Sequence, residues 1–227
     1  MPRDLGLAKR LRAAGLDVVE VPGWKTRGSD SFFPRGAVTH HTAGAPDRPG
    51  QKTPSLRICT FGRPDLSGPL CNTYLGYDRK VYVVAAGRAN HAGIPDGGSI
   101  KGMTGNSTAW GLEIEHPGTF PLPDDMAEIA ARIQAATVKG TTSADKVVYH
   151  KEWAPSRKID LATAPSPVTH RKRVAFYLNK NEQNTEENRK RLAVLRTWIR
   201  ARLDEGMSWS EIKKTFNWRE YKRRGGE

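Results

Sequence analysis

Two histidines and one aspartate are the residues whose types best suit metal chemistry. His40 and His150 end two short stretches of small and β-branched residues, Gly36–His40 and Val147–His150, each of which predicts a strand. Strands of one sheet can aim the side chains at their ends into a shared cleft, and Asp160 follows His150 by ten residues. Two neutral imidazoles and a carboxylate would supply the three protein ligands of a catalytic Zn2+, which keeps a fourth position open for water.

Two further charged residues suit hydrolysis beside such a metal. Lys158 precedes Asp160 by two residues, where its ammonium group could stabilise the oxygen of a polarised carbonyl. The alternation in Trp110–Glu115 puts Glu113 and Glu115 on one face of a predicted strand, and a carboxylate that faces a cleft suits a general base. The simpler alternatives stay open here: histidines that only form hydrogen bonds, and a glutamate pair on a solvated face.

Four segments in this order resemble a known family. They read VTHHTAG, NHAG, GLEIE and HKEWAPSRKID, over Val38–Gly44, Asn90–Gly93, Gly111–Glu115 and His150–Asp160. Together they resemble the zinc-dependent N-acetylmuramoyl-L-alanine amidases of type 2, the family shared with peptidoglycan recognition proteins. AAGRANHAG and LRAAGLDVVEVPGWKTRG are most similar to the amidase modules of endolysins from phages of actinobacteria. The resemblance covers roughly residues 5–178, and the His-x7-Lys-x-Asp spacing is its most specific part.

The resemblance implies a role for each matching residue. Zn2+ is expected on His40, His150 and Asp160. Lys158 is expected to stabilise the oxyanion, and Glu113 to activate water and return its proton to the leaving nitrogen. Contacts to peptidoglycan are expected from His91, from Asn106 and from His41, which lies on the other side of its strand from His40. The reaction implied is hydrolysis of the amide bond between N-acetylmuramic acid and L-alanine.

One position departs from the family pattern. Many members carry a catalytic tyrosine just before a histidine on the central hairpin, and here Cys71 and Asn72 stand in that place. Tyr74 could substitute only if the register shifted, and a shift by an odd number of residues would turn its side chain to the other face. Because receptor members of the family bind without cutting, a non-catalytic peptidoglycan-binding module on the same fold is the alternative.

The elements that must position these residues indicate an α/β protein. The resemblance implies a central mixed β-sheet flanked by helices, with a basic helical C-terminal extension. Gly44–Pro69, rich in glycine and proline, is predicted to be a long surface excursion. The other expected elements are helices at 4–14, 124–138 and 171–178, strands at 16–21, 36–40, 110–115 and 147–150, and a hairpin at 72–86.

Charge is distributed unevenly along the chain. The net charge is +13, and residues 161–227 hold 16 Lys and Arg against 8 Asp and Glu. We expect a zinc amidase domain over residues 1–178 and a basic helical extension over 179–227. The extension either binds anionic cell-wall polymers, with Trp198, Trp209, Trp218 and Tyr221 stacking on sugars, or packs as helices with a solvated basic face. Nucleic-acid binding is a third possibility, although the sequence carries no recognised DNA-binding signature.

Composition excludes several classes of protein. Hydrophobic residues make up 37% of the chain, enough for a core, which excludes a fully disordered protein. Two cysteines, Cys59 and Cys71, cannot form a disulfide framework and are predicted to be buried thiols. Neither a membrane-spanning run nor the apolar core of a signal peptide occurs. We therefore expect a monomer made in the host cytoplasm that reaches the wall after holin-type release, although a cytosolic peptidoglycan-recycling enzyme would share these features.

Overall fold

The computed structural model describes the backbone of residues 3–208 and 211, and the side chains of these residues outside 181–196. The chain divides into two compact units, Met1–Leu178 and Asn179–Glu227. All strands of the described residues lie in the first unit. In the described part of the chain, no helix has the length and hydropathy of a membrane-spanning segment.

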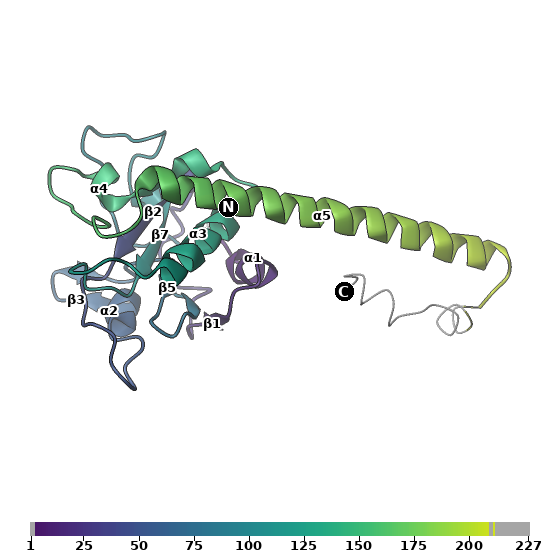
Figure 1. Cartoon of the computed structure of the whole chain (residues 1–227), viewed down its shortest axis with the longest axis horizontal. Coiled ribbons are helices and arrows are strands. Elements are labelled where there is room, and N and C mark those ends of the chain that lie inside the picture. Colours follow the sequence, from purple (N-terminus) through teal and green to yellow (C-terminus); the bar gives the residue numbers. More distant parts are fainter. Residues whose placement is uncertain (1–2, 209–210, 212–227) are drawn as a thin grey trace. The chain divides into compact units, whose positions relative to one another are not determined.

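A six-stranded mixed sheet forms the centre of the first unit (Figure 1). Its strand order is β1-β6-β5-β7-β2-β8. Only β5 and β6 pair antiparallel, and the other neighbours are parallel. The predicted α/β class with a central mixed sheet is therefore confirmed. The strands are β1 (Val18–Glu20), β2 (Gly36–His41), β5 (Thr73–Leu75), β6 (Val81–Val83), β7 (Ala109–Ile114) and β8 (Val147–Tyr149).

Two helices, α1 (Leu7–Ala13) and α3 (Asp124–Val138), pack together over one face of this sheet (Figure 1). The Arg10 Nε donates to the carbonyl of Ala136 at 3.0 Å, and Arg132 Nη2 donates to the carbonyl of Ala14 at 2.8 Å. The apolar stripe of α3 and the inward side chains of β5, β6 and β7 share one core with α1. This core covers one face of the sheet and leaves the other for the site.

Alternation along β2 divides its side chains between the two faces. Ala37 packs in a cluster with residues of α3, and Thr39 accepts a hydrogen bond from Gln134 of α3 at 2.8 Å. Val38 packs instead with Trp153 on the other side. Because successive side chains of a strand point to opposite faces, His40 lies on the same side as Val38, away from α3.

Most predicted elements of the first unit are confirmed within a few residues. The hairpin predicted at 72–86 is β5 and β6, and the helix predicted at 124–138 is α3. The prediction for Gly44–Pro69 was incomplete, because this stretch contains helix α2 (Leu56–Phe61) and a small hairpin of β3 (Gly62–Arg63) and β4 (Leu66–Ser67). Both predicted buried thiols are confirmed as free and buried.

Helix α5 (Pro167–Asp204) begins earlier and ends later than the helix predicted at 171–178. Its start has two sequence signals: the hydroxyl of Ser166 accepts the N–H of Thr169 at 3.1 Å, and a proline occupies the first helical position. After Pro167 the helix meets no proline or glycine until Gly206, whose φ is +83°. The boundary between the two compact units therefore falls inside a continuous helix.

The second unit carries part of the predicted basic extension. Ser208 and Glu211 form reciprocal hydrogen bonds, with the Ser208 N–H donating to Glu211 at 2.8 Å and the Glu211 N–H donating to the Ser208 hydroxyl at 3.4 Å. The guanidinium of Arg202 lies 5.6 Å from the ring centroid of Trp198. Trp209, Trp218 and Tyr221 lie outside the described residues, and the role predicted for this extension stays a prediction.

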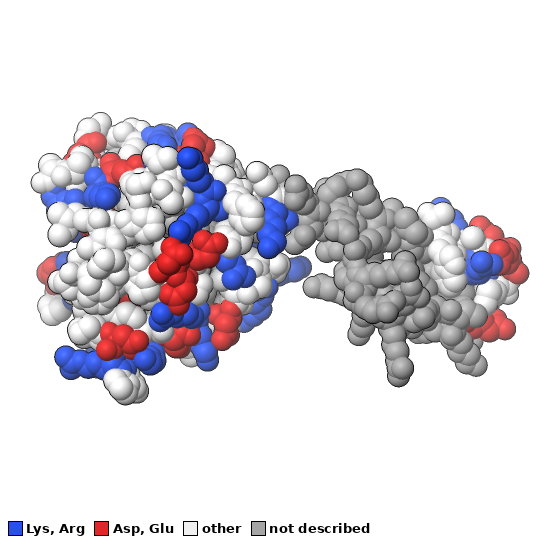
Figure 2. Space-filling view, viewed as in Figure 1, with Lys and Arg blue, Asp and Glu red and all other residues white. Residues whose placement is uncertain are grey.

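Positive and negative side chains alternate over the visible face of the first unit. Figure 2 shows blue and red groups interspersed there, with no broad area of one sign. Ion pairs of this unit include Arg79 with Asp125 at 2.7 Å and Arg173 with Asp124 at 2.7 Å. This face does not have the continuous basic stripe typical of a nucleic-acid-binding surface.

A buried histidine at the start of α5 makes the stability of the fold depend on pH. His170 is 3% exposed, and its ring centroid lies 5.0 Å from that of Tyr149. Burial lowers the pKa of His170 to about 3, and the charges of Arg171 and Arg173 add to this effect. The unfolded chain therefore binds one more proton than the folded chain between about pH 3 and pH 6.5.

Replacing this histidine should flatten the pH dependence of stability. Keeping His170 neutral costs no stability above pH 6.5, where the unfolded chain is also neutral at this residue. Below pH 6.5 the unfolded chain binds a proton that the folded chain does not, so the free energy of unfolding decreases as the pH falls toward 3. For His170→Leu, we expect the decrease in the free energy of unfolding between pH 7 and pH 5 to be about 2 kcal/mol smaller than for the unaltered protein. Urea unfolding at both pH values checks this, and parallel curves for the two proteins would contradict it.

Candidate metal centre

Parallel pairing brings the carboxyl ends of β2, β7 and β8 to one edge of the sheet. In the register, His40 pairs with Glu113 and Thr39 pairs with Tyr149. His150 comes directly after Tyr149 and begins the short helix α4 (His150–Trp153). The predicted placement of His40, Glu113 and His150 around one sheet edge therefore follows from strand direction and register alone.

A backbone hydrogen bond returns Asp160 to the start of α4. The N–H of Lys151 donates to the carbonyl oxygen of Asp160 at 2.7 Å. Helix α4 is itself fixed from two sides, because the Glu152 carboxylate accepts the N–H of Tyr149 at 2.9 Å and pairs with Arg171 at 2.9 Å. The loop after α4 is thus closed on a fixed element, and the Asp160 side chain comes beside His150.

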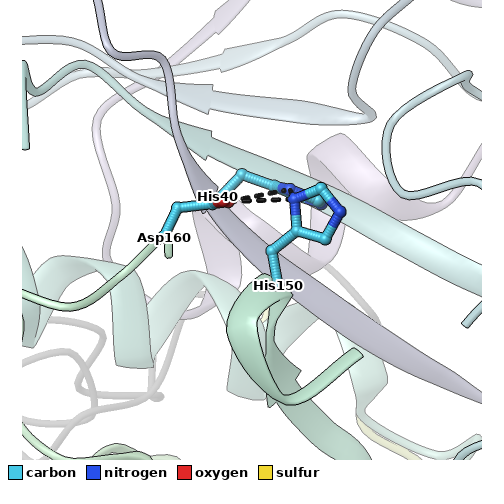
Figure 3. Close-up of side chains that lie close together, drawn as sticks. All are labelled: His40, His150 and Asp160. Atoms are coloured by element: carbon cyan, nitrogen blue, oxygen red, sulfur yellow. Dashed lines mark hydrogen bonds and ion pairs between the residues drawn. The ribbon is translucent and has the colours of Figure 1, made fainter. Parts of the chain in front are cut away.

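Three ligand atoms converge on one point (Figure 3). The Nδ1 atoms of His40 and His150 lie 2.8 Å apart, and Asp160 Oδ2 lies 3.0 Å from His150 Nδ1 and 3.4 Å from His40 Nδ1. Two ligand atoms at ordinary bond lengths from a tetrahedral Zn2+ are about 3.3 Å apart. The spacing of this group, which we call the His-His-Asp cluster, fits a small divalent metal ion.

His91 fixes which nitrogen of His40 is free to bind a metal. His91 Nε2 lies 3.0 Å from the carbonyl oxygen of Ala109, an acceptor, so this nitrogen carries the proton. Neutral His91 then accepts at Nδ1, and the partner at 3.0 Å is Nε2 of His40, which must carry a proton. The Nδ1 of His40 is left with its lone pair directed at the cluster. His91, expected to contact substrate, thus also accepts the hydrogen bond that orients a candidate metal ligand.

A glycine makes room for this arrangement. A Cβ on Gly111, in β7, would lie 2.6 Å from Cγ of His91. Real side chains do not approach so closely, so only glycine at this position lets the His91 ring lie against the strand. The glycine of the GLEIE segment therefore supports the orientation of His40.

The electrostatics of the cluster favour the forms that bind metals. Burial lowers the pKa of His40 to about 4, and His150 acts in the same direction, so the His40 imidazole is neutral at pH 7. Burial alone would raise the pKa of Asp160, but the neighbouring imidazoles of His150 and His40 hold it below its usual range. Two neutral imidazoles and a carboxylate are the protonation states required for a metal site.

Two buried polar atoms near the cluster have no hydrogen-bond partner among the described residues. These atoms are Nε2 of His150 and Oε2 of Glu113. Burial raises the pKa of Glu113 well above its usual range, neighbouring acidic groups including Asp160 add to this, and Lys158 opposes it. Glu113 therefore has a free carboxylate oxygen and a raised pKa, which are properties of a proton-transfer group.

A cavity of about 250 Å³ lies beside the cluster. Its wall includes His150 together with three residues named from the sequence, His91, Asn106 and Lys158. The side-chain oxygen of Asn106 accepts the N–H groups of Ala92 and Gly93 at 2.9 and 3.0 Å, which holds the loop after His91 in place. His41 is not part of this wall, since it lies beside His116 with ring centroids 6.3 Å apart.

Glu115 belongs to a buried network that the sequence did not reveal. Its carboxylate is fully buried and accepts hydrogen bonds from the hydroxyl of Tyr74, the hydroxyl of Thr42 and both the N–H and hydroxyl of Ser55. The alternative of a solvated glutamate face is therefore wrong. The only signal was the apolar composition of the two strands around Tyr74 and Glu115, which predicts burial but no partner.

Both residues that stand in the place of the family tyrosine, Cys71 and Asn72, are buried. Asn72 is fully buried, its amide group donates to the carbonyls of Ala85 and Gly87, and its oxygen accepts the N–H of Gly111. Cys71 is also fully buried. Tyr74 pairs with Glu113 in the register, yet its hydroxyl donates to Glu115. Neither Asn72 nor Tyr74 presents a free side-chain group to the cluster.

The sequence matches a family model over most of the first unit. Residues 30–167 match Amidase_2, the model of N-acetylmuramoyl-L-alanine amidase. The match includes every residue of the His-His-Asp cluster, as well as Glu113 and Lys158. No curated protein has a significant sequence match to the chain.

Solved structures with a similar course of the chain are distant in sequence. A selenomethionine derivative of AmpD is 22% identical, with 70% of this chain and 94% of that one covered and a TM-score of 0.49. The endolysin N-acetylmuramoyl-L-alanine amidase LysCS from Clostridium intestinale URNW is 19% identical, with 66% and 90% covered and a TM-score of 0.46. A mutant endolysin from Bacillus subtilis is 17% identical, with 70% and 99% covered and a TM-score of 0.48.

The geometry predicts how single substitutions change Zn2+ affinity. His91→Ala removes the acceptor of His40 Nε2–H, and losing such a partner typically weakens metal binding about 10- to 100-fold. Asp160→Ala removes a ligand and should abolish stable binding. Competition with a chromophoric chelator at pH 7.5 measures the Zn2+ affinity of both variants and of the unaltered protein.

The matched control is His41→Ala, which removes an imidazole from the adjacent position outside the cluster. Its Zn2+ affinity should equal that of the unaltered protein. Equal affinities for His91→Ala and the unaltered protein would contradict the orienting role of His91.

Proposed function

Since the chain belongs to the N-acetylmuramoyl-L-alanine amidase family Amidase_2, we propose that it is a zinc-dependent hydrolase of peptidoglycan. The bond cleaved is the amide between the lactyl group of N-acetylmuramic acid and L-alanine. One observation carries the proposal: His40 of the His-His-Asp cluster pairs with Glu113 in the sheet, and the cluster lies beside a cavity whose wall includes Lys158.

Zn2+ is the metal proposed for the cluster. His40, His150 and Asp160 would hold it, and it would supply a water molecule of lowered pKa and a Lewis acid for the carbonyl oxygen. His91 fixes the orientation of His40, and the Lys151 N–H fixes the backbone at Asp160. The protein thus holds His40 and His150 at the carboxyl ends of β2 and β8, and it holds Asp160 on a loop that this hydrogen bond closes onto α4.

Glu113 is proposed to move the proton during the reaction. It accepts a proton from the attacking water, whose oxygen forms the new bond to the carbonyl carbon. It then gives this proton to the alanine nitrogen as the carbon–nitrogen bond breaks. A buried carboxylate with a raised pKa can serve as both base and acid, and a bound divalent cation would bring that pKa back down.

Lys158 is proposed to stabilise the negative charge that develops on the carbonyl oxygen. Its side chain is partly exposed, belongs to the cavity wall together with His150, and acts electrostatically on both His40 and Glu113. A fixed positive charge at this place favours the tetrahedral transition state over the planar amide. The cavity would hold the sugar and stem peptide on either side of the scissile bond.

A non-catalytic recognition module is the second candidate, and the observation that favours it is the missing tyrosine. Cys71 and Asn72 stand in its place: Cys71 is a buried thiol, and the Asn72 side chain forms hydrogen bonds with backbone groups. The Tyr74 hydroxyl donates to Glu115. The amidase is preferred because the ligand set, the candidate base and the candidate oxyanion group occur together. A protein that only binds needs none of these three together.

We further propose that the protein is a phage endolysin that acts on the wall of an actinobacterial host after holin-type release. The support is the similarity of AAGRANHAG and LRAAGLDVVEVPGWKTRG to such modules. Adding the purified protein to host cells with permeabilised outer layers should lyse them, and cells that stay intact would oppose this part of the proposal.

Digestion of purified peptidoglycan tests the proposed activity. Cleavage at the proposed amide releases new alanine amino groups without new reducing sugars. The amino groups should fail to appear with a chelator and return when Zn2+ is added. If neither product forms while the protein still sediments with the wall, the recognition module is the correct function.

Replacing Lys158 separates metal binding from catalysis. Lys158→Ala should retain Zn2+ and lose about 10²- to 10³-fold in kcat, the usual cost of removing one group that stabilises an oxyanion. Lys9→Ala, an exposed lysine of α1, is the control and should cut at the rate of the unaltered protein. Full activity of Lys158→Ala would show that the role assigned to this residue is wrong.

A further inference from the structure

A second cavity of the first unit lies at the amino ends of β2, β7 and β8, opposite the metal cluster. Its volume is about 640 Å³, within the range typical of small-molecule sites. Arg35 directly precedes β2, Lys146 directly precedes β8, and Trp110 is the second residue of β7. Arg35 and His40 are five residues apart along an extended chain, or about 16 Å, so this cavity is separate from the cluster.

Cationic side chains dominate the wall of this cavity. Five positively charged side chains contribute to it: Arg3, Arg10, Arg35, Lys101 and Lys146. Asp4 is the one acidic residue of the lining. Arg10 pairs with Asp4 and Arg3 pairs with Asp30. The remaining three are in no ion pair within the described part of the chain. The cavity therefore retains excess positive charge.

Backbone carbonyl groups hold three of these cations, Arg10, Lys101 and Lys146, in place. Arg10 donates to the carbonyl of Ala136 at 3.0 Å. Lys101 donates to the carbonyl of Asp145, and Lys146 donates to the carbonyl of Lys101 at 2.8 Å. Lys101 and Lys146 also help Ser143 to lower the pKa of Asp145, whose side chain is not part of the wall. Cations held in place in this way lose little conformational freedom when they bind an anion.

Aromatic residues form the apolar part of the same wall. Phe32 and Trp110 are buried and meet edge to face, with ring centroids 6.0 Å apart. Phe33 is 59% exposed. The indole N–H of Trp110 is buried and has no acceptor among the described residues. The wall thus combines cations, exposed aromatic surface and a hydrogen-bond donor without a partner.

We propose that this cavity binds a phosphorylated sugar. Three cations without carboxylate partners suit a phosphate better than a single carboxylate, because phosphate carries more charge and more acceptor oxygens. The exposed ring of Phe33 offers a surface for the apolar face of a sugar. A cavity of this size, lined by five separate chain segments, suits a compact group such as a single sugar phosphate. The source would be the phosphate-bearing polymers of the cell wall, an assignment that rests on the proposed function.

Calorimetric titration of the full chain with N-acetylglucosamine 1-phosphate tests the proposal. Saturable binding is expected, with much weaker binding of N-acetylglucosamine. Arg35→Glu should weaken binding of the sugar phosphate about tenfold or more, since a charge-assisted hydrogen bond becomes a repulsion. The Arg35 side chain is exposed, so this change should leave the fold intact.

The matched control is Arg57→Glu, which changes the net charge equally at an exposed position of α2 outside the cavity. Its affinity should equal that of the unaltered protein. A second variant, Phe33→Ala, should weaken binding of the sugar phosphate more than binding of inorganic phosphate. Equal losses in Arg35→Glu and Arg57→Glu, or no saturable binding, would overturn the proposal. The proposal would also be overturned if the unaltered protein bound an oligonucleotide more tightly than the sugar phosphate and Arg35→Glu abolished binding of the oligonucleotide.

Sedimentation with cell walls distinguishes the two sources of the ligand. Walls that retain their phosphate polymers should bind the unaltered protein better than walls stripped with hydrofluoric acid, and Arg35→Glu should remove this difference. Binding of the sugar phosphate without such a difference would assign the cavity to a free sugar phosphate. Hydrolysis of soluble muropeptides should be unchanged in Arg35→Glu, so failure of the amidase proposal would be seen separately.

Discussion

The parallel pairing of β2 with β7 and β8 is the constraint on which the rest of the site depends. It sets His40 opposite Glu113 and sets Thr39 opposite Tyr149, directly before His150. A register shift of one residue would turn His40 toward α3 and replace it with His41 or Thr39 on the cleft face. The bond between Gln134 and Thr39 and the packing of Ala37 on α3 oppose such a shift.

Once this register is fixed, hydrogen bonds outside the cluster decide how its atoms are used. The Ala109 carbonyl sets the tautomer of His91, His91 sets that of His40, and Gly111 provides the space for the His91 ring. The buried carboxylate of Asp160 lies 3.0 Å from Nδ1 of His150 and 3.4 Å from Nδ1 of His40. The Zn2+ proposed here would compensate this buried negative charge.

Much of the fold and of the cluster could be predicted from the sequence, because both depend on local patterns. The hairpin, α3 and β2 have clear periodicity, and parallel strands carry the residues at their ends to a common edge. The partners of Glu115 could not be predicted, since Thr42, Ser55 and Tyr74 come from three separate segments. The basic cavity could not be predicted for the same reason. Arg35 and Lys146 belong to no recognisable motif, and they lie close together only because the amino ends of β2 and β8 are neighbours in the sheet.

The central claim is that His40, His150 and Asp160 form one metal site. X-ray absorption at the zinc edge, recorded on the full chain loaded with one equivalent of Zn2+, tests it most directly. The account predicts a tightly bound ion with nitrogen and oxygen neighbours at about 2.0–2.2 Å, two imidazole rings and no sulfur. An ion that fails to bind, one with a sulfur neighbour, or one with fewer than two imidazoles would contradict it.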